Sequence, residues 1–415
     1  MYTGYTIIAA TGVIAAVALI LVALLLFVKK KVTPSGKVRI DINDGRKVIE
    51  AEPGSSLMAT LAAEDIFLSS ACGGKASCGQ CKVQVTEGGG EILPTETGFF
   101  SRKQIKEDWR LGCQVKVKDD LAIKVSESTL SVRKYQCQVI SNRNVATYIK
   151  EFTVRLPQGA HMDFRSGQYI QIDVPAFHLT FKDMDIEPQY RAEWEKYGFP
   201  DLECVNEEPT TRAYSMASYP AEGDIIKLNV RIATPPKGLK VNPGVASSYI
   251  FTRKSGDTVN ISGPYGEFLL PQEDADDVEY IFIGGGAGMA PLRSHIMHLL
   301  RTLHTGRKVS FFYGARSLME AFYLEDYAAL EAEFPNFRFH LALDRPDPAA
   351  DAAGVPYTAG FVHDVLNRTY LKDHPAPEDI RYFLCGPPMM VSSVTGLLDS
   401  LGVPAQSILY DNFGS

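Results

Sequence analysis

Four cysteines are spaced as ligands of one inorganic centre. Cys72, Cys78 and Cys81 form the pattern C-x5-C-x2-C in a glycine-rich loop, and Cys113 follows later in the chain. A [2Fe-2S] cluster needs four thiolates that converge on two irons, and small residues let the backbone wrap around it and direct N–H groups to its sulfurs. A zinc ribbon, the alternative, more naturally shows two C-x2-C pairs. The spacing therefore predicts a [2Fe-2S] cluster held by these four residues.

A second group, Arg212, Tyr214 and Ser215, has the chemistry to bind a flavin nucleotide. These residues stand in the motif Arg-Ala-Tyr-Ser, which we expect at the start of a strand. The Arg212 guanidinium can pair with a pyrophosphate, and the Tyr214 ring can stack on a flavin. The Ser215 hydroxyl can hydrogen-bond near the reactive flavin nitrogen, which makes Ser215 a candidate catalytic residue. The structural alternative is a surface arginine beside a core tyrosine.

A complementary phosphate site is expected in the segment Gly244-Val-Ala-Ser-Ser-Tyr249. The sequence predicts a helix that opens after Gly244. The first N–H groups of a helix have no intrahelical partner, so they can bind phosphate. Either Ser247 or Ser248 could add a hydroxyl contact, and the sequence leaves both open. The order of the two motifs, between a cluster loop and a later nucleotide fold, predicts FAD.

Two further segments have the pattern of a nicotinamide-coenzyme site. Ile281-Phe-Ile-Gly-Gly-Gly-Ala-Gly-Met-Ala-Pro291 reads as a buried strand, a glycine loop and the start of a helix, and a later parallel strand is expected to end at Cys385-Gly-Pro-Pro388. Glycines there let the backbone approach a pyrophosphate at a helix N-terminus. The candidate binding residues are Gly284, Gly285, Gly286, Gly288, Pro291, Cys385, Gly386 and Pro387.

The elements that must position these groups fall into three successive domains, as expected for 415 residues. Residues 37–128 alternate in polarity around one short helix and predict an α+β domain for the cluster. Residues 132–272 contain short alternating runs and predict an antiparallel β-barrel for FAD, with 175–211 as an insertion of no readable role. Residues 275–415 contain continuous apolar runs between helices, typical of an α/β parallel sheet that binds NADH.

Residues 1–31 predict a single transmembrane anchor. No charged residue occurs from Tyr5 to Val28. A helix over this run would be about 36 Å long, enough to span the hydrocarbon core of a membrane. A cleaved signal peptide would need a basic start and a small-residue cleavage site. Three lysines follow at once, which places the remaining chain in the cytoplasm. The net charge of −7 comes without a basic stripe, so no nucleic-acid partner is expected.

The motif set resembles the ferredoxin-NADP⁺ reductase superfamily, preceded by a ferredoxin-like module with the longer first cysteine spacing of the vertebrate-type branch. In that superfamily the cysteine matching Cys385 lies beside the nicotinamide, and the Gly-Pro turn shapes the pocket. The resemblance also implies that Phe413 shields the flavin and moves for hydride transfer. Both residues are therefore candidate catalytic residues that also contact the cofactors.

The resemblance also bears on the choice of coenzyme. NADPH-dependent relatives carry a Ser-Arg pair where this chain has Asp344-Arg345. A carboxylate at Asp344 would repel a 2′-phosphate and can bond a ribose hydroxyl, which favours NADH. Arg316, in contrast, could pair with a 2′-phosphate, so this residue leaves NADPH open as the coenzyme.

Across its whole length, from anchor to the Asp-Asn-Phe-Gly-Ser end, the chain resembles the F subunits of the bacterial Na⁺-translocating NADH:quinone reductases. The resemblance implies an NADH-oxidising enzyme of the bacterial inner membrane, in which hydride passes to FAD and single electrons pass through the cluster to other membrane subunits. Ubiquinone would be the final acceptor, and Na⁺ would cross elsewhere in the complex. The alternatives are a membrane-anchored NADH reductase of an oxygenase, and a non-enzymatic iron-sulfur relay.

Overall fold

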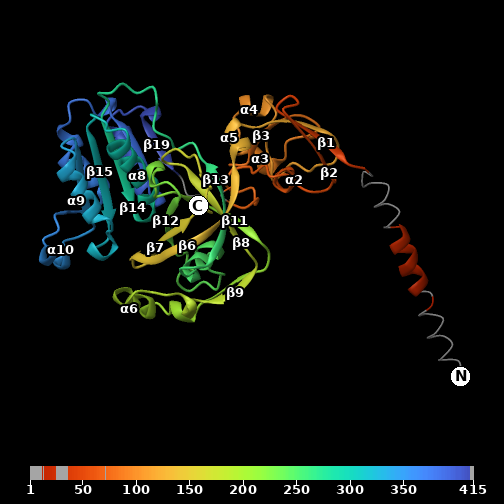
Figure 1. The fold of residues 1–415 in the computed structure, drawn as a ribbon, viewed down its shortest axis with the longest axis horizontal. Helices are drawn as coiled ribbons and strands as arrows, with labels where there is room; N and C mark the ends of the chain where they lie inside the picture. The colour runs from red at the N-terminus through yellow and green to blue at the C-terminus, as the bar shows by residue number, and fades with distance from the viewer. Residues whose placement is uncertain (1–11, 13, 25–35, 71, 412–415) are drawn as a thin grey trace. The chain divides into compact units, whose positions relative to one another are not determined.

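The computed structural model describes residues 12, 14–24, 36–70 and 72–411. Contacts divide the chain into two compact units, Met1–Leu68 with Gly74–Leu130, and Ser69–Gly73 with Ser131–Ser415 (Figure 1). Most of the predicted anchor lies outside the described residues. Within it, residues 12 and 14–24 are helical, with exposed apolar side chains such as Ile14 and Leu19. Among the described residues, no helix combines the length and apolar character needed to cross a membrane.

The first unit is built on a five-stranded sheet of order β2-β1-β5-β3-β4. Its first two strands form an antiparallel hairpin, in which Asn43, Asp44 and Gly45 make the turn with positive φ angles. Its strands are β1 Val38–Ile42, β2 Lys47–Ala51, β3 Lys82–Glu87, β4 Trp109–Leu111 and β5 Leu121–Lys124, and its helices are α2 Leu57–Ala63, α3 Pro94–Thr97, α4 Arg102–Lys106 and α5 Glu127–Ser131. The α+β class predicted for this region is confirmed.

A buried ion pair braces the segment that leads to Cys113. The Glu96 carboxylate is 0% exposed and accepts hydrogen bonds from the Arg110 guanidinium and from the backbone N–H of Leu111 at 2.8 Å. Arg110 also donates to the carbonyls of Gly89 and Gly90. Charges this deep are tolerated because each polar atom has a partner.

Removing one residue of the Glu96–Arg110 pair should therefore leave the other charge buried without compensation, which destabilises the unit. We expect Glu96→Ala to lower the free energy of unfolding of this unit by about 3–5 kcal/mol, because the Arg110 charge stays buried without its carboxylate. Denaturant unfolding followed by the visible absorbance of the cluster would measure this. The exposed Glu107, which pairs with Lys103 at 3.8 Å, gives a matched control in Glu107→Ala. Equal loss in both variants would contradict the argument.

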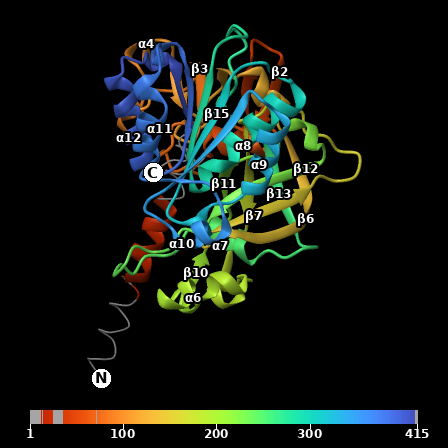
Figure 2. The ribbon, with the colours of Figure 1, turned by 90° about the vertical axis from the view of Figure 1, so that its left-hand side faces the viewer.

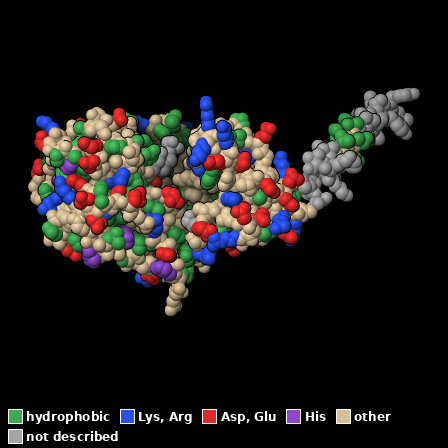
Figure 3. Space-filling model, turned by 90° about the horizontal axis from the view of Figure 1, so that it is seen from above, with side chains coloured by type: hydrophobic (Ala, Val, Ile, Leu, Met, Phe, Trp, Pro, Cys, Tyr) green, Lys and Arg blue, Asp and Glu red, His purple; other side chains and the backbone are tan. Residues whose placement is uncertain are grey.

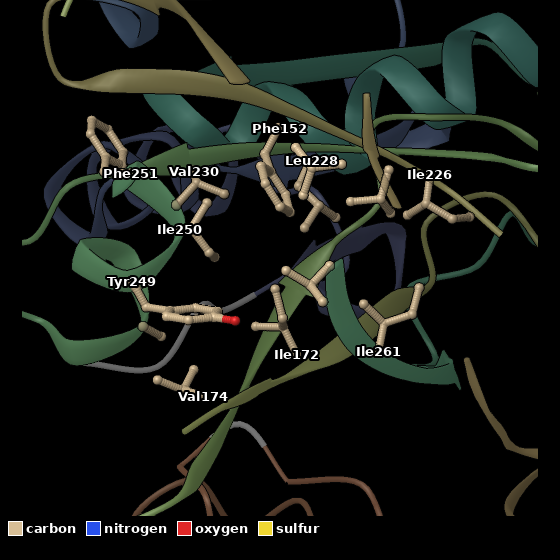
Figure 4. Packing of buried hydrophobic residues seen from close by; sticks show 14 of the residues in the cluster. Phe152, Ile172, Val174, Ile226, Leu228, Val230, Tyr249, Ile250, Phe251 and Ile261 are labelled. Carbon is tan, nitrogen blue, oxygen red and sulfur yellow. The ribbon is translucent and has the colours of Figure 1, made fainter. Parts of the chain in front are cut away.

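The second unit begins with a six-stranded antiparallel sheet of order β11-β8-β13-β6-β7-β12. A backbone bridge between Met216, just past β11, and Leu228 of β12 links its two outer strands. Figure 4 shows side chains of the strands, including Phe152 and Ile261, packed with Ile250 and Phe251 of helix α7. The strands are β6 Arg133–Ala146, β7 Ile149–Arg155, β8 Tyr169–Val174, β11 Thr210–Ser215, β12 Ile225–Arg231 and β13 Thr258–Tyr265, and the helix is α7 Val245–Thr252.

The insertion of residues 175–211 forms its own small layer against this sheet. It contains β9 Phe177–Thr180, η1 Phe181–Asp183, α6 Pro188–Lys196, η2 Phe199–Asp201 and β10 Glu203–Asn206. Phe181, Tyr190 and Trp194 turn inward and join the core of the antiparallel sheet. The insertion is thus an ordered part of the unit, seen at its lower edge in Figures 1 and 2.

The rest of the unit is a six-stranded parallel sheet of order β17-β16-β15-β14-β18-β19. Neighbouring residues of β14 point to opposite faces. Phe282 joins one core with α8 and α9, and Ile283 joins the other with α11 and α12. Two-sided burial explains the continuous apolar runs in the sequence. The strands are β14 Tyr280–Gly285, β15 Val309–Ala315, β16 Phe337–Leu343, β17 Thr358–Ala359, β18 Arg381–Cys385 and β19 Ile408–Asp411, with helices α8 Met289–Met297, α9 Leu324–Glu333, α10 Pro348–Ala353, α11 Val362–Thr369 and α12 Pro388–Ser400.

On the face of this larger unit shown in Figure 3, acidic and basic side chains are interspersed. That face therefore presents no continuous basic stripe of the kind that follows a nucleic-acid backbone.

Candidate functional site

Three of the predicted cluster ligands lie in the first unit, and Cys72 lies in the short segment grouped with the second. Cys81 and Cys113 are buried, and their thiols are hydrogen-bond neighbours. The Gly112 N–H donates to the Cys81 carbonyl at 2.8 Å and joins the two segments. The contact with Cys113, followed by burial, raises the pKa of the Cys81 thiol.

The loop around these thiols has the backbone that wrapping a cluster requires. Gly74, Ala76 and Gly79 all have φ between +56° and +86°. No group of three or more His, Cys, Asp or Glu side chains in the described part of the chain is arranged around one metal ion. A binuclear cluster does not require such a group, because its four thiolates are shared between two irons. The buried thiols and the left-handed loop fit a [2Fe-2S] cluster.

The predicted flavin motif, Arg212 to Ser215, forms the last four of the six residues of β11. The expectation that it starts a strand is wrong, because Thr210 and Thr211 already pair with β8. The Arg212 side chain donates to Thr210 Oγ1 and the Thr211 carbonyl, both at 2.7 Å. Tyr214 is partly buried, and burial raises its pKa. Ser215 ends the strand in a buried position.

Gly244 caps α7 as predicted, and the first helical bond runs from the Ser248 N–H to the Gly244 carbonyl at 2.9 Å. The Ser247 hydroxyl lies between Gly244 O, to which it donates at 3.0 Å, and the Ala233 N–H, from which it accepts at 3.1 Å. Ser248 Oγ is buried without a hydrogen-bond partner in the described residues. Ser247 therefore shapes the loop before the helix.

The glycine loop follows β14 and packs directly on the end of β18. A Cβ on Gly288 would lie 2.0 Å from the Cys385 carbonyl oxygen, and one on Gly284 would lie 2.7 Å from Leu292 Cδ1. Gly286 has φ +57°, in the left-handed region. A side chain would clash with the backbone at Gly288 and would be strained at Gly286, so glycines here leave the backbone between β14 and α8 open to close approach by a ligand. Pro291 lies buried in α8, while Gly386 and Pro387 lead from β18 into α12.

Asp411 brings the flavin motif and the cysteine together. The Ser215 hydroxyl donates to Asp411 Oδ2 at 2.7 Å, and Asp411 stands opposite Cys385 in the parallel pairing of β18 and β19. Burial raises the pKa of Asp411, and the hydrogen bond from Ser215 opposes that rise. Burial, together with the Asp411 charge, also raises the pKa of Cys385, so its thiol is neutral at pH 7.

Asp344 follows β16 at the same edge of the sheet. Its N–H donates to the Ala315 carbonyl at 3.1 Å, which places it beside the end of β15 that leads to Arg316. The structure thus brings Ser215 and Cys385 to one carboxylate, whereas Asp344 lies at the end of β16, which β15 and β14 separate from β18. Phe413 lies outside the described residues.

Sequence reasoning missed Asp411. The sequence did contain a sign of this residue, since Asp411 stands two positions before Phe413, the aromatic residue expected to shield the flavin. Recognising it required the register of β19 against β18, which pairs residues far apart in the chain.

Comparison with known proteins agrees with this arrangement. The family described as "2Fe-2S iron-sulfur cluster binding domain" matches residues 40–118, "Oxidoreductase FAD-binding domain" matches 195–269, and "Oxidoreductase NAD-binding domain" matches 282–395. The F subunit of the Na(+)-translocating NADH-quinone reductase of Pseudomonas aeruginosa PAO1 is 50% identical over 411 residues, 99% of each chain. That of Pseudoalteromonas atlantica is 50% identical over 405 residues, 97% of this chain and 98% of the relative.

Among solved structures, the Amycolatopsis cytochrome P450 reductase GcoB has a TM-score of 0.63 and 24% identity, covering 91% of this chain and 98% of its own. The ferredoxin reductase of carbazole 1,9a-dioxygenase has a TM-score of 0.58 and 22% identity, with the same coverage. At these identities the likeness concerns the fold alone.

Fold and site define an oxidoreductase that combines a [2Fe-2S] domain with FAD- and NAD-binding domains. Its cofactors are FAD and the [2Fe-2S] cluster, and NADH is its substrate. The chain belongs to the family of the F subunits of Na⁺-translocating NADH-quinone reductases.

The hydrogen bond between Ser215 and Asp411 generates a prediction. In Asp411→Ala the Ser215 hydroxyl loses its acceptor, and we expect flavin reduction by NADH to slow about tenfold through loss of positioning. FAD should stay bound, because Asp411 lies on β19 and not in the phosphate-binding segments. Anaerobic stopped-flow absorbance measures the rate. An unchanged rate in Asp411→Ala would show that the contact is incidental.

Proposed function

We propose that this chain is the NADH-oxidising, electron-input subunit of a Na⁺-translocating NADH:ubiquinone reductase. The observation that carries the proposal is the contact of Ser215 with Asp411, which joins the flavin motif to the strand beside Cys385 within one unit. When bound, FAD accepts two electrons as hydride from NADH and releases them singly, which suits a one-electron cluster. Membership of the F-subunit family supports the Na⁺- and quinone-linked role.

The residues of this chain would divide the work as follows. Arg212 pairs with the FAD pyrophosphate, the N–H groups at the start of α7 bind phosphate, and Tyr214 packs on the flavin. Ser215 would place its hydroxyl near the reactive nitrogen, Cys385 would lie beside the nicotinamide, and Phe413 would shield the flavin. The glycine loop and Pro291 receive the coenzyme pyrophosphate, Gly386 and Pro387 shape its pocket, and Asp344 bonds a ribose hydroxyl.

Cys72, Cys78, Cys81 and Cys113 would hold the [2Fe-2S] cluster. The burial of Cys81 and Cys113 and the positive φ angles of the loop support this set. The separate sheets support domain boundaries at 37–128, 132–272 and 275–415, and the bridge from Met216 to Leu228 supports a closed barrel.

A single-pass anchor within residues 1–31 would hold the protein at the bacterial inner membrane, with its other domains in the cytoplasm. The uncharged run before three lysines supports this topology. The partners are then other membrane subunits of the complex, where Na⁺ crosses and the quinone is reduced.

Anaerobic titration of the detergent-solubilised chain with NADH tests the proposal. Flavin bleaching and the paramagnetic signal of the reduced cluster should appear together. In Cys113→Ala the flavin should still bleach while the cluster signal is absent, because one iron loses a ligand. A wild-type cluster that is reduced only by dithionite would refute electron transfer from NADH through FAD.

The coenzyme preference can be tested separately. Asp344→Ser removes the negative charge that repels a 2′-phosphate, and we expect the ratio of kcat/KM for NADPH to that for NADH to rise about tenfold or more. Steady-state reduction of ferricyanide with each coenzyme measures the ratio. Asp364→Ser, on the exposed face of α11, is the control, and an unchanged ratio in Asp344→Ser would refute the repulsion argument.

A further inference from the structure

The tip of the β6–β7 hairpin extends from the antiparallel sheet to the parallel sheet, which carries the predicted coenzyme site. Ala146 and Ile149 flank the tip and belong to the apolar core of the parallel sheet. A Cβ on Gly286 would lie 3.8 Å from Ile149 Cδ1, so the hairpin borders the glycine loop. The Thr147 hydroxyl donates to the carboxylate of Glu320, in η6 (Leu318–Glu320) beyond β15.

A second set of contacts, made by Tyr323, connects the same hairpin to the parallel-sheet region. The Tyr323 hydroxyl donates to Glu151 Oε2 of β7 at 2.6 Å and accepts from Asn229 Nδ2 at 2.9 Å. The Arg293 guanidinium lies over the Tyr323 ring, 5.2 Å from its centre. Tyr323 has φ +62°, an unfavourable backbone conformation for a tyrosine. The two hydrogen bonds and the contact with Arg293 stabilise Tyr323 in this conformation.

Residues 175–211, the insertion, also hydrogen-bond to this hairpin. The Trp194 indole N–H donates to the Thr147 carbonyl at 2.7 Å, and Glu187 Oε1 accepts the Asn144 N–H at 2.8 Å. Lys150, only 1% exposed, donates to the carbonyl of Asp185 within the insertion. A buried ammonium group needs such partners, so the insertion is a required neighbour of the hairpin.

We propose that the insertion of residues 175–211 is a brace that sets the alignment of the nicotinamide on the flavin. It fixes the β6–β7 hairpin, and the hairpin fixes the glycine loop and Tyr323 against the flavin-binding sheet. Trp194 and Glu187 are positioning residues in this arrangement and touch neither cofactor. The proposal rests on the proposed hydride transfer from NADH to FAD, whose rate is sensitive to displacements of about 1 Å.

The test compares variants of the full chain in anaerobic stopped-flow reduction by NADH and by NADH deuterated at the transferred position. Glu187→Ala should lower the limiting rate of flavin reduction about tenfold and raise the isotope effect, as expected for a misaligned donor. The dissociation constant for NADH and the FAD content should stay near the wild-type values. Glu187→Gln should restore the rate, because its amide oxygen can still accept the Asn144 N–H. Trp194→Phe, which keeps a buried ring and removes the donor, should show a smaller decrease.

Glu193→Ala is the matched control, since Glu193 lies on the same helix and pairs at the surface with Lys196 at 2.9 Å. It should leave the rate and isotope effect unchanged. Wild-type rates and isotope effects in both Glu187→Ala and Trp194→Phe, with only a lower melting temperature, would overturn the brace. Loss of FAD from Glu187→Ala would overturn it in favour of a cofactor-retaining role. Failure of the proposed function itself is distinguishable, because the wild-type flavin would then not be reduced by NADH.

Discussion

The arrangement of the coenzyme site depends on a buried ion pair between the two six-stranded sheets of the larger unit. Arg293, on the helix that follows the glycine loop, donates to the Ala217 carbonyl at 2.6 Å and pairs with Glu222 at 3.3 Å. Its neighbour Ser294 donates to the Ser218 carbonyl at 2.8 Å. These acceptors lie just beyond Ser215, so the pair joins the helix behind the pyrophosphate loop to the end of the flavin-motif strand.

Burying these charges costs free energy, which their mutual pairing and the hydrogen bond to the Ala217 carbonyl offset. Burial acts to raise the pKa of Glu222, but Arg293 and Lys227 outweigh it and hold that pKa below its ordinary value. The carboxylate therefore stays ionised at neutral pH and keeps both cations in place. The flavin and nicotinamide rings must lie in a fixed relative position. Directional ionic hydrogen bonds between the two sheets define that position more strictly than apolar contacts would.

The sequence predicted the sheets because burial leaves a regular mark on a chain. Two-sided burial produced the continuous run of β14, and one-sided alternation marked β1, where the structure confirms both. It misjudged the position of Arg212 within its strand because strand ends are set by pairing, here of Thr210 with Val174. The insertion was unreadable because its apolar residues are matched to a surface formed by distant strands.

Sequence alone determined which chemistry this protein can perform, since the spacing of cysteines, glycines and the Arg-Ala-Tyr-Ser motif reflects local demands of a cluster, a pyrophosphate and a flavin. Only the tertiary structure decided which groups meet. The contact of Ser215 with Asp411 spans 196 positions in the chain, and that of Trp194 with Thr147 spans 47. Such contacts leave no periodic mark, because they depend on the packing of whole sheets and not on any spacing along the chain.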